Sequence, residues 1–143
     1  MRQVEYGDAR GHETMNKITE RVKLGTFGEL LVQLRILEFD VQAAQPLKDS
    51  GNDLIAIRGE AMRAIQVKAT KIEDDGYRVR GDLPERYHAL AIVKFEGGEG
   101  TLYLDQSRIF LIAKEDVRNG RWSDEELERH AFSGEIVNRL FPR

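Results

Sequence analysis

The chain has 143 residues, 41% of them hydrophobic and 33% charged, which favours one globular domain over residues 1–143 with residues 1–12 as a loosely ordered arm. It contains no cysteine, which excludes disulfides, thiolate zinc sites and cysteine nucleophiles. The formal net charge of -3 gives no general attraction to nucleic acid, and the sequence shows no signal peptide or membrane-length apolar run, so a cytoplasmic protein without a membrane segment is expected.

The first elements predicted along the chain are two helices. A polar helix is predicted over residues 12–23, and Gly25 ends it. A second, more apolar helix is predicted over residues 26–37, because apolar side chains recur there at helical spacing. That spacing predicts a buried stripe formed by Phe27, Leu30, Leu31, Leu34 and Leu37. Residues 39–45 then predict a first strand, which stops at Pro46.

A β-hairpin is predicted next, with strands over residues 54–57 and 62–70 and a tight turn between them. Residues 71–84 predict a loop, whereas the nearly continuous apolar run over residues 88–95 predicts a strand that is covered on both faces. Further strands are predicted over residues 101–105 and 108–113, and Ser123 with Glu126 predicts a capping box that starts a C-terminal helical region. Helices at both ends of a series of strands favour an α/β or α+β layer fold with a mixed sheet.

The predicted hairpin brings polar side chains to one face. With Gly59 and Glu60 as the central turn residues, Asp53 opposes Gln66, and the Cβ atoms of such pairs lie about 4.5 to 5.5 Å apart. Lys68 follows two residues later on the same face. The plainer interpretation is a half-exposed strand beside an Asp that belongs to a turn. The spacing alone leaves both interpretations open.

Glu29, on the second predicted helix, also has two interpretations. In the first, it points toward the sheet, because Val32 and Ile36 flank it. In the second, Thr26 and Glu29 form a T-x-x-E capping box, in which the Glu side chain only satisfies a backbone N–H group.

Together these residues resemble the PD-(D/E)xK nuclease superfamily: Glu29 on a leading helix, Asp53 in the context G-N-D-L-I, and Gln66-Val67-Lys68 on the next strand. The Gln resembles the QxK variants, which include intron-associated homing endonucleases, and the leading Glu is similar to that of Holliday-junction resolvases. The resemblance covers residues 25–68 and implies a restriction-endonuclease-like α/β fold, a mixed β-sheet flanked by α-helices. Two departures stand out, because Pro46 is not adjacent to Asp53 and Gln66 supplies a neutral oxygen instead of a carboxylate.

The resemblance implies a metal-dependent DNA endonuclease that hydrolyses phosphodiester bonds with Mg²⁺, for which Mn²⁺ can substitute. It implies that Asp53, Glu29 and Gln66, with the backbone carbonyl of Val67, hold the metal. Lys68 then positions or deprotonates the attacking water and stabilises the charge of the transition state. A homodimer is expected, because a two-fold enzyme matches the two-fold backbone of duplex or junction DNA.

Two alternatives remain open at this point. The acidic composition and the neutral Gln66 also fit a catalytically inactive nuclease-fold domain that binds nucleic acid or a protein partner. The second alternative is an ordinary α+β scaffold on which Asp53, Gln66 and Lys68 lie together by coincidence. The three histidines have no metal-ligand spacing and are expected to be surface or core residues: His12, His88 and His130.

Overall fold

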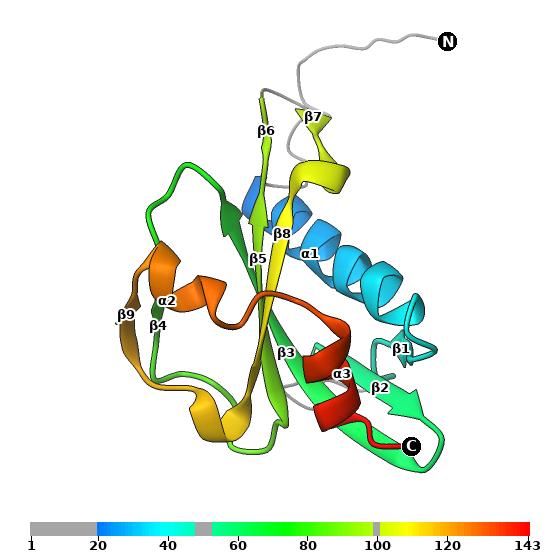
Figure 1. Cartoon of the computed structure of the whole chain (residues 1–143). Helices are drawn as coiled ribbons and strands as arrows, with labels where there is room; N and C mark the ends of the chain where they lie inside the picture. The colour runs from blue at the N-terminus through cyan, green and yellow to red at the C-terminus, as the bar shows by residue number, and fades with distance from the viewer. Residues whose placement is uncertain (1–19, 48–52, 99–100) are drawn as a thin grey trace, which may run out of the picture.

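A five-stranded mixed sheet forms the centre of the computed structural model, which describes residues 20–47, 53–98 and 101–143 (Figure 1). Its strands lie in the order β1–β2–β3–β5–β8. Only β3 and β5 run parallel among these neighbours, and the other pairs are antiparallel. The strand bounds are β1 Gln42–Ala44, β2 Leu54–Arg58, β3 Ala61–Lys71, β5 Ala89–Phe95 and β8 Arg108–Ala113. The predicted α/β fold with a mixed sheet is therefore confirmed.

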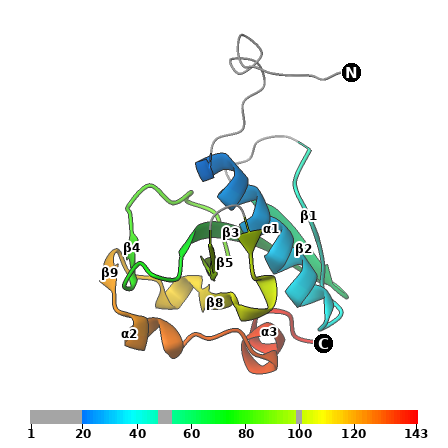
Figure 2. The ribbon, with the colours of Figure 1, turned by 90° about the horizontal axis from the view of Figure 1, so that it is seen from above.

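Helices and two short strand pairs cover this sheet. The helices are α1 Glu20–Leu37, α2 Asp124–Glu128 and α3 Gly134–Leu140. The strand pairs are β4 Tyr77–Val79 with β9 Gly120–Trp122, and β6 Gly97–Gly98 with β7 Thr101–Leu102; 3-10 turns span Leu104–Gln106 and Lys114–Asp116. Seen from above, α1 and α3 lie on one side of the sheet, and α2, β4 and β9 lie on the other (Figure 2). No helix in the described ranges is long and apolar enough to cross a membrane.

Strand β5 is buried along its whole length, as predicted, but it begins at Ala89, and the exposed His88 lies outside it. Its side chains alternate between two apolar clusters, because successive side chains of a strand point to opposite faces. Ala91 and Val93 belong to the cluster that includes α1 and α3, whereas Leu90 and Ile92 belong to the cluster that includes Trp122. The sheet is therefore covered on both faces at its centre.

Helix α1 corrects the prediction of two helices with a break at Gly25. It is one helix from Glu20 to Leu37, and residues 12–19 lie outside the described ranges. Thr26 lies inside this helix, where its hydroxyl donates to the carbonyl of Val22 at 3.2 Å. The capping-box interpretation of Glu29 is therefore wrong, because a residue in the middle of a helix has no free terminal N–H group to satisfy.

The buried face of α1 also differs from the predicted stripe. Leu31, Val32 and Ile36 are at most 3% exposed, whereas the other predicted stripe residues are only partly covered: Phe27 is 36% exposed, and Leu30, Leu34 and Leu37 are each 54% exposed. Gly28 also lies on the buried face. A Cβ atom at Gly28 would lie 3.1 Å from the Cβ of Ala69, so any larger residue would push the helix or β3 apart by a few tenths of an ångström.

The predicted hairpin register is confirmed. Leu54 pairs with Ile65 and Arg58 with Ala61, which leaves Gly59 and Glu60 as the turn. Gly59 has a φ of 62°, a conformation that favours glycine and that tight hairpin turns require. Asp53 therefore directly precedes the first paired residue of β2.

The region predicted as a loop over residues 71–84 contains β4, which pairs with β9 some forty residues later in the chain. A buried lysine holds this region in place. Lys94 is 2% exposed, and its ammonium group donates to Asp124 Oδ1 at 2.8 Å, to the carbonyl of Gly76 at 3.0 Å and to the carbonyl of Asp74. Three acceptors satisfy its three N–H groups, so a charge can stay buried there.

In the C-terminal region the predicted start of the helix is confirmed, whereas one predicted strand is shorter than expected. Ser123 and Glu126 form the predicted capping box, with reciprocal hydrogen bonds of 3.1 and 2.9 Å. The strand predicted over residues 101–105 is limited to β7, and a 3-10 turn follows it, so that prediction was wrong in length.

Candidate active site

Asp53 and Gln66 are in direct contact at the end of β2. The Asp53 carboxylate accepts hydrogen bonds at Oδ2 from Gln66 Nε2 at 2.9 Å and from the backbone N–H of Val67 at 2.8 Å. Because β2 begins at Leu54, opposite Ile65, β3 continues past the end of β2. The N–H of Val67 therefore needs an acceptor other than a neighbouring strand, and the Asp53 side chain supplies it.

This arrangement leaves two oxygen atoms without donors. Gln66 is 6% exposed, and its Oε1 is buried and accepts no hydrogen bond from any residue that the structure describes. None of these residues donates to Asp53 Oδ1 either. A buried acceptor without a partner costs about 1–3 kcal/mol, so the buried Gln66 Oε1 marks a place where water or an ion can complete the site.

A second carboxylate, Glu29, reaches this region from α1. Gln45, just after β1, donates a side-chain hydrogen bond to Glu29 Oε1. Partial burial raises the pKa of Glu29, the Gln45 hydrogen bond opposes this shift, and the charge of Asp53 adds to it. Gly28, the residue before Glu29, packs closely on β3, which places Glu29 on a turn of α1 that lies near the sheet.

Lys68 lies two residues beyond Gln66 on β3 and is half-buried. It borders a cleft of about 270 Å³ between β3, the N-terminal half of α1 and the segment that begins with β4. Arg80 and Asp82 border the same cleft from the β4 side. Neither Lys68 nor Arg80 makes a hydrogen bond or ion pair with another described residue, so both cations are available to an anion.

The donor atoms suit a hard cation. Asp53, Glu29 and Gln66 offer carboxylate and amide oxygens, and Mg²⁺ needs only one or two carboxylates when water and substrate phosphate complete its shell. Within the described ranges, no group of three or more His, Asp or Glu residues could hold a metal. The neutral Gln66 is not one of these residue types, so the candidate site has two carboxylates and one amide.

The two histidines in the described ranges make contacts within the fold. His88 accepts a hydrogen bond at Nδ1 from the backbone N–H of Ala64 at 2.9 Å, and His130 packs edge-on against Trp122. His12 lies outside the described residues.

The structure brings Asp53, Gln66 and Val67 of the predicted site into direct contact, and the roles predicted for them, for Glu29 and for Lys68 stay predictions. The contact predicted between Asp53 and Gln66 is present, whereas Val67 contributes its N–H to Asp53 rather than only a carbonyl. Gln45 and Arg80 were not predicted. The alternation of Arg78, Val79 and Arg80 was a signal for a strand with basic residues on one face.

Comparison with known proteins gives a structural likeness only. No protein-family model matches the chain, and no curated protein matches it by sequence. The structure is similar to that of the bacterial homing endonuclease I-Ssp6803I, with a TM-score of 0.60 and 13% sequence identity over 85% of this chain and 94% of that chain. The five-stranded mixed sheet with its flanking helices thus has the fold of a homing endonuclease.

Proposed function

We propose that this protein is a metal-dependent DNA endonuclease that hydrolyses phosphodiester bonds. The observation that carries the proposal is the contact between Asp53 and Gln66, which leaves a buried amide oxygen free beside a carboxylate. Lys68 on the same strand and the likeness to a homing endonuclease support it. Phosphodiester hydrolysis needs this combination of oxygen ligands for a metal and a cation near the reacting phosphate.

Each residue has a distinct role in the proposal. Asp53 and Gln66 would hold Mg²⁺ or Mn²⁺ through side-chain oxygens, while the hydrogen bonds from Gln66 and Val67 to Asp53 Oδ2 fix the carboxylate in place. Glu29 completes the metal shell directly or through water, and the carbonyl of Val67 is a further candidate ligand. When bound, the metal makes water a better nucleophile and offsets phosphate charge. Lys68 orients or deprotonates that water and stabilises negative charge that develops on the phosphate.

DNA binds in the cleft beside this site. The net charge of the chain is -3, so attraction to DNA has to come from local cations rather than from the whole protein. Lys68 and Arg80 line the cleft without partners among the described residues and can each contact a backbone phosphate. A homodimer would place two such sites on a two-fold substrate.

A cleavage assay tests the proposal. Supercoiled plasmid, linear duplex and four-way-junction DNA are incubated with the full chain and with Mg²⁺ or Mn²⁺. We expect cleavage by the wild type and by Asp105→Ala, an exposed aspartate on a 3-10 turn, and its loss in Asp53→Ala and Lys68→Ala. Absence of cleavage on all three DNAs with both metals would rule the proposal out.

The neutral Gln66 supports a second candidate function, a nuclease-fold domain that binds nucleic acid or a protein but does not cut. With one acidic ligand fewer, the site attracts a divalent cation less strongly. The same DNAs distinguish the two candidates. The second candidate predicts that the protein binds DNA without cutting it and that Asp53→Ala leaves the affinity for DNA unchanged. Metal-dependent product that disappears in Asp53→Ala would exclude the second candidate.

A further inference from the structure

The cleft at Lys68 is bordered by charged side chains, by apolar side chains and by the backbone of β3. Its charged residues are two cations and one acid, and neither cation, Lys68 or Arg80, has a partner among the described residues. Its apolar side chains come from α1, β3, β4, β5 and the segment after β4: Leu24, Val67, Val79, Leu83 and Leu90.

The backbone at this cleft is a free edge of β3. β2 pairs with β3 only up to Ile65, and beyond that point β3 pairs with β5 alone among the described strands. Val67 donates its N–H to Asp53 at 2.8 Å, whereas Ile72, just past the strand, donates its N–H to β5 at 2.8 Å. Backbone groups alternate between the two edges of a strand, so the N–H and C=O of Ala69 point to the same side as the N–H of Val67. There they meet no described partner, and Ala69 presents one donor and one acceptor to the cleft.

The length of this free edge decides which kind of molecule it fits. A peptide that adds a strand pairs over about five or six residues. Here the side chain of Asp53 occupies the N–H of Val67, and the carbonyl of Lys71 accepts a hydrogen bond from the N–H of Asp74 at 3.1 Å. The open part is therefore about one residue long, which suits the edge of a single nucleic-acid base, where a donor lies beside an acceptor.

The other two sides of the cleft fit the rest of a nucleotide. The ammonium of Lys68 and the guanidinium of Arg80 suit a phosphate, and the apolar side chains suit the face of a base. The volume of about 270 Å³ is near the lower end of the roughly 300–1,000 Å³ of pockets that bind one small molecule. The cleft can therefore hold one nucleotide but not a duplex.

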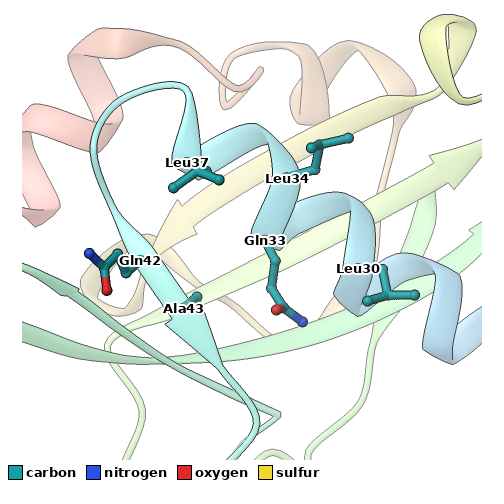
Figure 3. A pocket seen from close by; sticks show the side chains of 6 residues that line it. All are labelled: Leu30, Gln33, Leu34, Leu37, Gln42 and Ala43. Carbon is teal, nitrogen blue, oxygen red and sulfur yellow. The ribbon is translucent and has the colours of Figure 1, made fainter.

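The groove between α1 and β1 lacks these features. It has a volume of about 450 Å³, and six uncharged residues line it (Figure 3): Leu30, Gln33, Leu34, Leu37, Gln42 and Ala43. Without a cation, this groove offers no contact for a phosphate. It shares no lining residue with the cleft at Lys68.

We propose that the cleft at Lys68 binds one unpaired nucleotide of the DNA substrate. The inference rests on the proposed function and names its substrate class, DNA in which a base has left the duplex stack. A paired base has to be flipped out of the duplex before it can enter, and the free-energy cost of flipping is least for a base that is already unpaired. DNA with an unpaired nucleotide therefore binds more tightly than the same duplex fully paired.

Fluorescence anisotropy of labelled DNA tests this preference, with the full chain and without divalent metal so that nothing is cut. The two DNAs are a fully paired duplex and the same duplex with one extra, unpaired nucleotide in one strand. The wild type is expected to bind the second DNA with a Kd at least about tenfold lower.

The variant Gly25→Leu tests whether the preference comes from the cleft. Gly25 lines the cleft, and a Cβ atom there meets nothing within 4 Å, so a leucine side chain takes up space that the nucleotide needs. Leucine also favours a helix more than glycine does, so the circular dichroism spectrum is expected to stay that of a folded protein. The preference is expected to fall at least about threefold in Gly25→Leu. The control is Gln33→Leu, which places the same side chain on α1 in the other groove and is expected to keep the wild-type preference.

Two results would overturn the inference. One is a wild type that binds the two DNAs with equal affinity, which would leave the free edge of β3 to a protein segment. The other is a Gly25→Leu variant with the wild-type preference. Because binding is measured without metal, a protein that prefers the unpaired DNA but never cuts would contradict the nuclease proposal alone. A protein that cuts DNA but shows no preference would contradict this inference alone.

Discussion

Replacement of Gln66 by Glu is a sharp probe of the candidate active site. In the structure Gln66 Nε2 donates to Asp53 Oδ2 over 2.9 Å, and residue 66 is 6% exposed. An ionised glutamate cannot donate, so Gln66→Glu replaces this hydrogen bond by repulsion between two carboxylates in a buried place.

The distance sets the size of the effect. At an effective dielectric constant of about 20, two unit charges 2.9 Å apart repel by about 6 kcal/mol. The new glutamate avoids part of this by binding a proton, which at pH 7 costs about 4 kcal/mol for a carboxyl of ordinary pKa near 4.3. The variant takes whichever state costs less, and protonation costs less than repulsion. The free energy of unfolding should therefore fall by about 3–4 kcal/mol and the Tm by about 10 °C.

Urea and thermal unfolding without metal, at pH 7 and at pH 4, measure this effect. The control is Gln106→Glu, the same chemical change at an exposed position. Repulsion raises the pKa of the new glutamate in the folded state, so the penalty is present at neutral pH and disappears as the pH falls and the group binds a proton. A difference between the two variants below about 0.5 kcal/mol at pH 7 would refute the geometry of the site.

Three further predictions concern the cleft, the buried lysine and α1. Arg80→Ala should make the fall of log K for binding duplex DNA with log salt concentration less steep by about 0.9, the contribution of one phosphate contact. Arg139→Ala on α3 should leave this slope unchanged. If both variants keep the wild-type slope, Arg80 does not contact the DNA backbone. The Lys94 hydrogen bond lowers the pKa of Asp124, so the stability it contributes is present above the ordinary pKa of 3.8 and is lost as the pH falls through the lowered value. Because Asp124 is 56% exposed, Asp124→Asn should cost only about 1–2 kcal/mol at pH 7 in urea unfolding, and no loss would contradict the anchoring role of the pair. Gly25→Ala should stabilise α1 by about 1 kcal/mol, since a Cβ there meets nothing within 4 Å, whereas Gly28→Ala should not stabilise it; equal gains would contradict the close packing on β3.

The hairpin could be predicted from the sequence because its information is local. Gly59 fixes the turn, and the period of two fixes which side chains share a face, so the contact of Asp53 with Gln66 followed from the register.

The buried face of α1 could not be predicted from the sequence, because apolar residues occur around most of the helix. Leu31 and Ile36 are buried, whereas Leu30 and Leu34 are exposed, and the helical period fits either set. The buried face packs on strands far away in the sequence, as in the close contact of Gly28 with Ala69, forty-one residues later. Contacts between distant segments likewise decide the pairing of β4 with β9 and the burial of Lys94.

Metal-dependent nicking of supercoiled plasmid DNA tests the central claim most directly. The rate is measured for the wild type and Asp53→Asn, which keeps the size of the side chain but removes the charge that would hold the metal in the nuclease proposal. The nuclease proposal predicts cleavage that requires Mg²⁺ or Mn²⁺ and a rate at least about 100-fold lower for Asp53→Asn. Equal rates for the two proteins, or no metal-dependent cleavage by the wild type, would contradict it.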